Sequence, residues 1–343
     1  MKVSLNHVTG NFPDFLVVGA AKAGTTSIHH YLKNHPDIFL PQRKELEFWH
    51  QNRNPNKALL AYNWNSPIPT TLIEYLSHYE KTSESQLVGE VCPAYLYYYQ
   101  YVIDSLKDYH PNWKKVKILI ILREPVSRII SQYRFVRNQF LDPENLSFED
   151  GLIAEDRRKK ENNLLLDLFY KDLSRYTEQV SAYLNAFDNV FICLYDELKN
   201  DNYHLMNKIC NFLQVDGYKM KLENTVYNKS EDVRVYRGNF TKKIFNIARD
   251  SNLNLPDKVK EKIKFALNSI LLKKEKEISE ELIYMLKREF EQEIIELEKV
   301  IGKDLSAWKQ SYSRDIHTDS IKLKPRHDTI GGTGASHWGA DKL

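Results

Sequence analysis

The stretch that decides the fold is Phe15-Leu-Val-Val-Gly-Ala-Ala-Lys-Ala-Gly-Thr-Thr26. Its apolar start, ending at Gly19, predicts a short buried strand over residues 15–19, and residues 25–34 predict a helix. Glycines at such a junction let the backbone approach a ligand closely, and the first N–H groups of the helix point toward an anion. With the charge of Lys22, the stretch predicts a phosphate-binding turn. A glycine-rich turn with a surface lysine is the alternative.

The turn departs from the G-x-x-x-x-G-K-[ST] loop of nucleotide triphosphatases in two ways. Gly19 and Gly24 keep the spacing, but Thr25 stands where that loop has lysine, and the lysine lies inside the turn. The apolar run at residues 117–122 ends in Arg123, whereas a triphosphatase strand often ends in an aspartate that helps to hold magnesium. The pattern therefore favours a ligand with two separated anionic ends and no bridging metal.

A second anion site is predicted beside the strand at residues 117–122. Pro125 begins a predicted helix over residues 125–140, and Ser131 lies about two turns into it. Arg123 and Ser131 could hold one phosphate, since arginine binds phosphate with two parallel hydrogen bonds. For Arg128 and Arg134 we expect salt bridges on an exposed helix face.

The remaining pattern predicts an α/β fold. A third strand at residues 189–194 and a helix at residues 203–213 repeat the alternation, which is typical of a parallel sheet covered on both faces. A late helix begins at Ser279 and carries one apolar stripe. We expect one domain over residues 1–312, with residues 142–172 as a charged, irregular insertion or lid, and a flexible tail over residues 313–343.

Composition excludes several classes of protein. The 343 residues include 49 basic and 46 acidic side chains, a net charge of +3, which argues against a nucleic-acid-binding protein. The longest apolar run, Ile118 to Leu122, is far shorter than the ~18 residues that span a bilayer. Three unpatterned cysteines argue against disulfides and zinc. We therefore expect a cytoplasmic protein without a membrane span, and with no metal site.

These stretches resemble the sulfotransferases that use 3′-phosphoadenosine 5′-phosphosulfate (PAPS). Residues 22–27, Lys-Ala-Gly-Thr-Thr-Ser, are similar to the family's 5′-phosphosulfate motif, and residues 121–131 are similar to its 3′-phosphate motif. Weaker similarities occur in the family's order at residues 35–49, 89–95 and 302–308. The resemblance implies a P-loop-like three-layer fold, with a central parallel sheet flanked by helices.

The resemblance also implies roles for residues. The donor PAPS, and its product adenosine 3′,5′-bisphosphate, would be held by Lys22, Ala23, Gly24, Thr25, Thr26 and Ser27 at one end and by Arg123 and Ser131 at the other. Arg237 and Gly238 are a loose match to the loop that completes the 3′-phosphate site. Glu45 aligns with the catalytic base of the branch related to heparan sulfate enzymes and bacterial sulfotransferases, and Lys22 would assist catalysis. Glu90 and Tyr95 would lie at the acceptor.

Several alternatives stay open at this point. Without the resemblance, Glu45 and Glu47 read as a surface pair bound to Lys44 or Arg43, and Glu90, His29 and His30 are rival bases. The acceptor is expected to be a hydroxylated natural product or small metabolite, or else an oligosaccharide or glycolipid; O- and N-sulfation both remain open. A P-loop kinase or nucleotide hydrolase and a non-catalytic nucleotide-binding protein are the competing functions.

Overall fold

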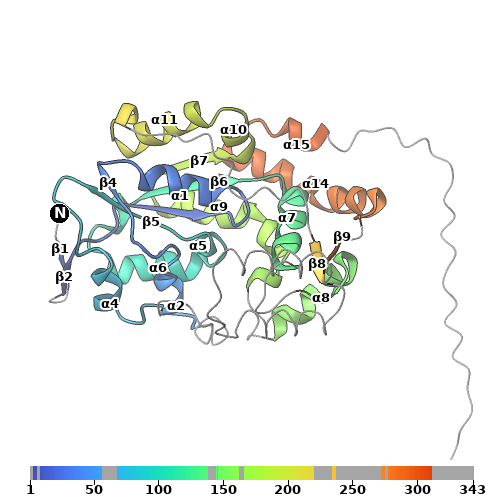
Figure 1. Cartoon of the computed structure of the whole chain (residues 1–343), viewed down its shortest axis with the longest axis horizontal. Coiled ribbons are helices and arrows are strands. Elements are labelled where there is room, and N and C mark those ends of the chain that lie inside the picture. Colours follow the sequence, from blue (N-terminus) through green and yellow to red (C-terminus); the bar gives the residue numbers. More distant parts are fainter. Residues whose placement is uncertain are drawn as a thin grey trace, which may run out of the picture. The chain divides into compact units, whose positions relative to one another are not determined.

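Five parallel strands form the central sheet of the computed structural model (Figure 1). In sheet order they are β4 (Ile38–Phe39), β5 (Leu87–Val91), β3 (Phe15–Gly19), β6 (Lys117–Leu122) and β7 (Val190–Leu194). The three predicted strands are confirmed, and they are neighbours in the sheet. Because β3 and β6 pair side by side, the turn after Gly19 and the end of β6 at Arg123 lie at the same edge of the sheet.

The structure describes most of the chain. The described residues are 3–5, 8–55, 68–137, 144, 146–161, 166–219, 234–236, 272–274 and 277–310.

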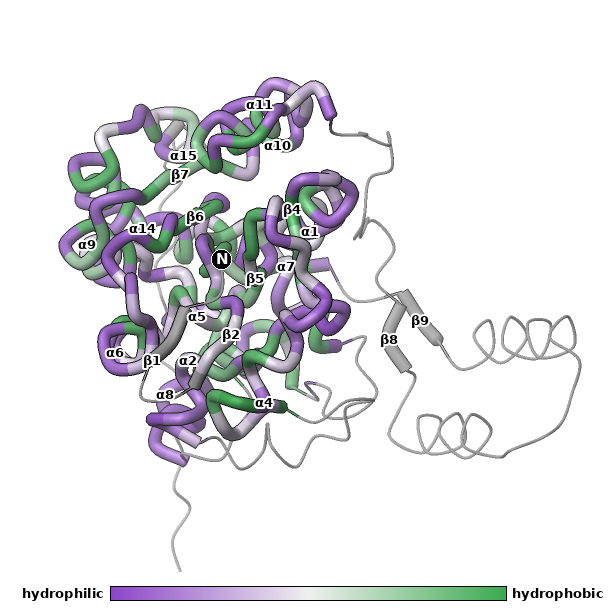
Figure 2. The backbone as a smooth tube through the Cα atoms, turned by 90° about the vertical axis from the view of Figure 1, so that its left-hand side faces the viewer, coloured by the Kyte–Doolittle hydropathy of each residue, from purple (hydrophilic) through white to green (hydrophobic). Residues whose placement is uncertain are grey.

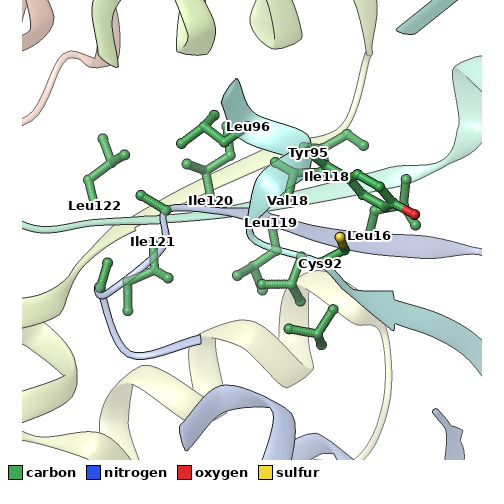
Figure 3. Close-up of a cluster of buried hydrophobic side chains, with 14 of the residues drawn as sticks. Leu16, Val18, Cys92, Tyr95, Leu96, Ile118, Leu119, Ile120, Ile121 and Leu122 are labelled. Atoms are coloured by element: carbon green, nitrogen blue, oxygen red, sulfur yellow. The ribbon is translucent and has the colours of Figure 1, made fainter. Parts of the chain in front are cut away.

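Strand β6 is deeply buried in the sheet. Residues 118–122 have no solvent exposure, and Figure 3 shows Ile118 and Ile120 pointing to one side of the strand and Leu119 and Ile121 to the other. In Figure 2, β6 and β7 are among the apolar, green parts of the tube. Both faces of the sheet are thus covered, as the continuous apolar run predicts.

Helices cover both sides of the sheet, with α10 and α11 on one side and α2, α4 and α6 on the other in Figure 1. The three-layer α/β fold expected from the sequence is confirmed. The α-helices are α1 (Thr25–Lys33), α2 (Phe48–Gln51), α4 (Leu72–Ser77), α5 (Ala94–Tyr97), α6 (Tyr99–Tyr109), α7 (Pro125–Arg137), α8 (Phe148–Lys160), α9 (Tyr176–Ala186), α10 (Tyr195–Asn200), α11 (Asn202–Leu213), α14 (Glu280–Ile301) and α15 (Ser306–Gln310). Four 3₁₀ turns and four short strands complete the described elements: η1 (Trp113–Lys115), η2 (Leu166–Leu168), η3 (Asp172–Ser174), η4 (Gly217–Lys219), β1 (Val3–Leu5), β2 (Val8–Gly10), β8 (Arg234–Tyr236) and β9 (Leu272–Lys274).

The late helix α14 begins and ends as its sequence predicts. The Ser279 side chain accepts a hydrogen bond from the Leu282 amide, and Gly302 ends the helix with a φ of 63°. The apolar stripe Leu286, Phe290, Ile294 and Leu297 is buried. Downstream, the Trp308 indole donates to the Asp196 carboxylate of α10 at 3.2 Å, which indicates a structural role for Asp196.

The expectation of an irregular segment over residues 142–172 is wrong for its middle part. Residues 148–160 form the regular helix α8, capped by Ser147, because Glu149 and Asp150 lie in its first turn and four basic residues lie in its last. Arg158 of that basic run is buried and donates to Glu144 at 2.5 and 2.8 Å. Whether the segment acts as a lid stays a prediction.

The chain divides into two units, Met1–Tyr312 and Ser313–Leu343. The elements above belong to the first unit, and the predicted tail lies outside the described residues.

Candidate active site

The predicted anion turn joins β3 to α1. Gly24 has a φ of 99°, which other residues rarely adopt, and a Cβ atom on it would lie 2.7 Å from Leu198 Cδ2 of α10. Helix α1 starts at the next residue, Thr25, so the amides of Thr25, Thr26 and Ser27 have no carbonyl partner within the helix. No hydroxyl of these three residues makes a hydrogen bond to another described side chain or carbonyl. The turn therefore offers several donors to an anion.

Lys22 adds the charge at this turn. Its backbone has a φ of 66°, and its Nζ atom lies 3.6 Å from the centroid of the Phe135 ring on α7. Burial, together with the positive charges of Arg128, Arg123 and Lys44, lowers the pKa of Lys22 to about 8, against the opposing effect of Asp167. A lysine held among other cations gains most from an incoming anion.

Arg123 lies directly beside the turn. Its Nη1 atom donates to the Lys22 carbonyl at 3.1 Å, and its guanidinium lies 4.7 Å from the centroid of the Tyr195 ring. Tyr176 Oη donates to the Arg123 carbonyl at 3.0 Å, which fixes the backbone where β6 ends. The structure thus brings together the two cations that the sequence places 101 residues apart.

Helix α7 follows Arg123 and carries Ser131 on its buried side. The Glu124 carboxylate accepts hydrogen bonds from the amides of Val126 and Ser127, at 3.0 and 2.6 Å, and so occupies the start of this helix. Ser131 is 9% exposed, and no hydrogen bond between described residues joins it to Arg123. Arg237 and Gly238, predicted to complete this anion site, lie outside the described residues.

The expectation for Arg128, a salt bridge on an exposed helix face, is wrong. Its side chain has no solvent exposure, and it donates to Ser174 Oγ at 2.5 Å and to the Tyr170 carbonyl at 2.6 Å. The reason is that the segment from Tyr170 to Ser174 packs against α7 and supplies two neutral oxygen acceptors; the Arg128 Nη1 atom has no hydrogen-bond partner among the described residues. Arg128 adds positive charge behind the turn.

Two carboxylates lie on a strained segment between β4 and α2. The non-glycine residues with positive φ in the described part of the chain are Lys22, Glu45, Glu47 and Gln214. Such backbone costs on the order of 1–3 kcal/mol per residue, and it concentrates at functional sites. Three of the four residues belong to the candidate site, which supports a functional reading of the Glu45–Glu47 segment.

Glu45 and Glu47 have different partners. Glu45 is partly exposed and forms an ion pair with Lys44, as the alternative reading of the sequence predicts for it. Glu47 is 6% exposed and bonds to the fully buried His50, which lies on α2. The His50 ring stacks on Tyr98 with centroids 4.3 Å apart. Sequence reasoning did not find His50, whose signal is only its spacing of three residues from Glu47.

Glu90 lies at the end of β5, under the Glu45–Glu47 segment, and is 1% exposed. It accepts hydrogen bonds from Tyr75 Oη and Tyr95 Oη, both at 2.7 Å, and from the Leu46 amide at 3.2 Å. Burial raises the pKa of Glu90 to about 7, against the lowering effect of these tyrosines. Glu90 therefore holds the segment between the two strained carboxylates, while contact of Glu90 or Tyr95 with an acceptor stays a prediction.

Asp167 on η2 is a further carboxylate, and its charge acts on Lys22. Its Oδ1 atom accepts a hydrogen bond from Gln132 Nε2 at 2.9 Å, and its carbonyl accepts from the same group at 3.1 Å. Burial raises the pKa of Asp167, the Gln132 hydrogen bond lowers it, and Glu45 and Lys22 then act in opposite directions. Sequence reasoning placed this residue within the insertion and did not single it out, because nothing in the local pattern connects it to the turn.

The two rival histidines lie on α1. His29 is buried, and burial lowers its pKa to about 4, while His30 contacts it edge to face at 5.9 Å between centroids.

Across the described part of the chain, no cluster of three histidine, cysteine or acidic side chains has a metal-binding arrangement. Of the described helices, none combines the length and apolar character needed to cross a bilayer.

Comparison with known proteins identifies the family. A family model described as "Sulfotransferase domain" matches residues 12–264. A crystal structure of a sulfotransferase from Alicyclobacillus acidocaldarius superposes with a TM-score of 0.62 at 25% identity, covering 87% of this chain and 99% of that chain.

Two curated relatives match shorter stretches of the chain. The membrane-associated sulfotransferase kil1 of Dictyostelium discoideum is 29% identical over 123 residues, which are 36% of this chain and 23% of that protein. The human heparan sulfate glucosamine 3-O-sulfotransferase 5 is 25% identical over 134 residues, 38% of this chain and 33% of that protein. The matched part thus spans a third or less of the length of either relative.

Proposed function

Since the chain belongs to the sulfotransferase family, we propose that it transfers a sulfuryl group from PAPS to an acceptor and releases adenosine 3′,5′-bisphosphate. The observation that carries this proposal is the pairing of two cations at the sheet edge. Arg123, which follows the neighbouring strand β6, donates from its Nη1 atom to the backbone carbonyl of Lys22 in the turn after β3, at 3.1 Å. A donor with a phosphosulfate end and a 3′-phosphate end suits such a site.

We assign the donor-binding roles as follows. Lys22 and the groups of residues 23–27 hold the phosphosulfate and 5′-phosphate, because helix N–H groups and a cation stabilise phosphate charge. Arg123 and Ser131 hold the 3′-phosphate, and Arg237 and Gly238 complete that part of the site. The hydroxyls of Thr25, Thr26 and Ser27 fit this donor set.

In the reaction, the acceptor oxygen or nitrogen bonds to sulfur while the bond from sulfur to the 5′-phosphate oxygen breaks. Lys22 stabilises the negative charge that develops on the departing oxygen. Glu45 takes the proton of the acceptor, and its partner Lys44 orients the carboxylate. Products are the sulfated acceptor and adenosine 3′,5′-bisphosphate, and no step requires a metal.

For the acceptor we propose a hydroxylated small molecule. The alternative, an oligosaccharide or glycolipid, is supported by the similarity to the human heparan sulfate glucosamine 3-O-sulfotransferase 5. A kinase or hydrolase is disfavoured because Arg123 occupies the strand end where such enzymes need an acidic residue.

The three cysteines are buried and unpaired, which supports a reducing compartment such as the cytoplasm.

A transfer screen tests this function. The full chain is incubated with ³⁵S-labelled PAPS, a chelator and a panel of phenols, sugars and amines, and labelled products are separated from the donor. We expect label on at least one acceptor, and none with Lys22→Ala. Transfer from PAPS that occurs only with magnesium would overturn the proposal. So would the absence of label on every acceptor, if the protein consumes ATP in a parallel assay.

A further inference from the structure

A cavity of about 830 Å³ lies beside the candidate site. Residues of α5, α6, α8, α9 and α14 line it, together with the chain after η2. Five of the described lining residues are aromatic: Tyr97, Tyr98, Tyr99, Tyr101 and Phe169. A volume of this size holds a small molecule with one or a few rings.

The cavity adjoins the carboxylates of the site on two sides. Tyr98 lines the cavity and stacks on His50, which in turn bonds to Glu47. On the other wall, Phe169 follows η2, which carries Asp167 beside Lys22. Tyr98 and Phe169 therefore link the cavity wall to the Glu47–His50 pair and to the segment that carries Asp167.

The cations of the cavity wall are already paired with carboxylates. Arg158 bonds to Glu144 at 2.5 and 2.8 Å, Lys159 pairs with Asp172 at 2.8 Å, and Arg175 pairs with Glu289 at 3.0 Å. The described lining contains these three cations and four carboxylates, Asp172, Glu178, Glu293 and Glu296. A polyanionic acceptor would have to compete with these ion pairs, whereas an uncharged acceptor leaves them intact.

The same wall offers ring faces and hydrogen-bonding groups. Tyr97 and Phe169 lie with centroids 6.3 Å apart, and Tyr98 and Tyr101 are separated by the same distance. The amides of Asn54 and Gln100 also line the cavity. Aromatic faces pack against flat rings, while amides and hydroxyls pair with hydroxyl groups on the ligand.

We propose that this cavity holds the acceptor, and that the acceptor is an uncharged ring compound that carries hydroxyl groups. The inference rests on the proposed sulfuryl transfer and restricts its acceptor class. Tyr101 and Phe169 pack against the ring of the acceptor.

Binding of two probes to the full chain, saturated with adenosine 3′,5′-bisphosphate, tests the assignment. 4-Nitrophenyl β-D-glucopyranoside is uncharged and carries both an aromatic ring and a sugar, whereas a heparin hexasaccharide is a polyanion. Saturation-transfer NMR gives the affinity of each without requiring turnover. We expect the glucoside to bind, and Tyr101→Ala and Phe169→Ala each to weaken it roughly three- to tenfold, as the loss of one ring contact implies.

The matched control is Tyr203→Ala, which removes a tyrosine of α11 that is 52% exposed and does not line the cavity. It should leave glucoside affinity unchanged. Preference for the hexasaccharide, or glucoside binding unaffected by both cavity variants, overturns the assignment. Calorimetry with adenosine 3′,5′-bisphosphate in the same samples keeps the two proposals apart: intact nucleotide binding without glucoside binding contradicts the cavity assignment, and absent nucleotide binding contradicts the proposed function.

Discussion

Lys22 is the residue whose charge state most directly controls the proposed donor site. Its pKa, lowered to about 8 by burial and neighbouring cations, means that the free protein loses this charge as pH rises through 8. The phosphates of adenosine 3′,5′-bisphosphate are already fully ionised above pH 7, since their second pKa is about 6. Any loss of affinity above pH 7 therefore reflects titration of a group on the protein and not of the ligand.

We predict that affinity for adenosine 3′,5′-bisphosphate falls by about tenfold or more between pH 7 and pH 9.5, because a charged hydrogen bond contributes roughly 1.5–3 kcal/mol. Lys22→Arg should bind with little dependence on pH, since arginine stays protonated throughout this range. Calorimetry at half-unit pH steps measures both. A flat profile for the unaltered protein, or the same slope in Lys22→Arg, would contradict the role of Lys22.

Arg123 should act on donor binding rather than on the chemical step. The 3′-phosphate is remote from the transferred group, so its contacts are alike in the ground and transition states. We predict that Arg123→Ala raises the donor KM about tenfold to a hundredfold and changes kcat little. Arg157→Ala, which alters an exposed arginine of α8 with 74% side-chain exposure, is the control. An unchanged KM in Arg123→Ala would remove the assignment.

At the scale of elements, the strained segment between β4 and α2 carries the proposed base. We predict that Glu45→Gln folds normally, binds adenosine 3′,5′-bisphosphate nearly as well, and loses about 10² to 10⁴ in kcat, because glutamine cannot accept the proton. Steady-state kinetics with a hydroxyl acceptor measures this loss. Near-normal turnover in Glu45→Gln together with an inactive Glu90→Gln would move the base to Glu90, and an inactive His29→Gln alone would move it to the histidine.

Strand β5 holds that segment through Glu90, and its burial gives a stability prediction. In the unfolded chain Glu90 ionises near its usual pKa of 4.5, but in the folded protein only near 7. Its contribution to stability is therefore fully present below pH 4.5 and is lost as pH rises through 7. By pH 8 the loss is on the order of 3 kcal/mol.

We predict that the free energy of unfolding of the unaltered protein falls from pH 5 to pH 8 relative to that of Glu90→Gln, which cannot ionise. Urea denaturation at four pH values measures the difference. Glu80→Gln, at an exposed position, should keep the pH dependence of the unaltered protein. A difference between the unaltered protein and Glu90→Gln that does not change with pH would contradict the burial argument.

The elements also explain what could be predicted from the sequence. The junctions at residues 15–34 and 117–137 were predictable because each pairs an apolar run with a local helix start, Gly24 or Pro125. Strand β5 was not predicted, because Gly89 and Glu90 break its apolar pattern. Gly89 is required there since a Cβ atom would lie 2.1 Å from the Phe15 ring, and Glu90 is tolerated because hydroxyls from Tyr75 and Tyr95 satisfy it.

In the candidate site, the sequence predicted the residues that lie on strand–helix junctions and missed those that tertiary packing adds. Lys22 and Arg123 follow apolar strands, so their proximity follows from a parallel sheet. Asp167 and Arg128 reach the site only through the packing of η2 and η3 against α7, which no local pattern encodes. His50 is likewise held beside the candidate site by its stacking on Tyr98, a contact that the sequence does not reveal.

At the scale of the whole molecule, the order of the sheet is what makes the site. Placing β3 between β5 and β6 brings three segments distant in sequence to one edge: the anion turn, the end of β6, and Glu90 beneath the Glu45–Glu47 segment. Open α/β sheets bind ligands at this edge. The solved sulfotransferase structure from Alicyclobacillus acidocaldarius shares the fold over 87% of this chain.

We propose that this edge of the sheet binds a two-phosphate nucleotide through protein cations and not through a metal. Calorimetric titration of the full chain with adenosine 3′,5′-bisphosphate, in excess chelator and again with magnesium, tests it most directly. We predict the same affinity in both buffers, a loss of about tenfold to a hundredfold in Lys22→Ala and in Arg123→Ala, and no comparable binding of ATP with magnesium. Binding that disappears in chelator, or tighter binding of ATP with magnesium, would contradict the account.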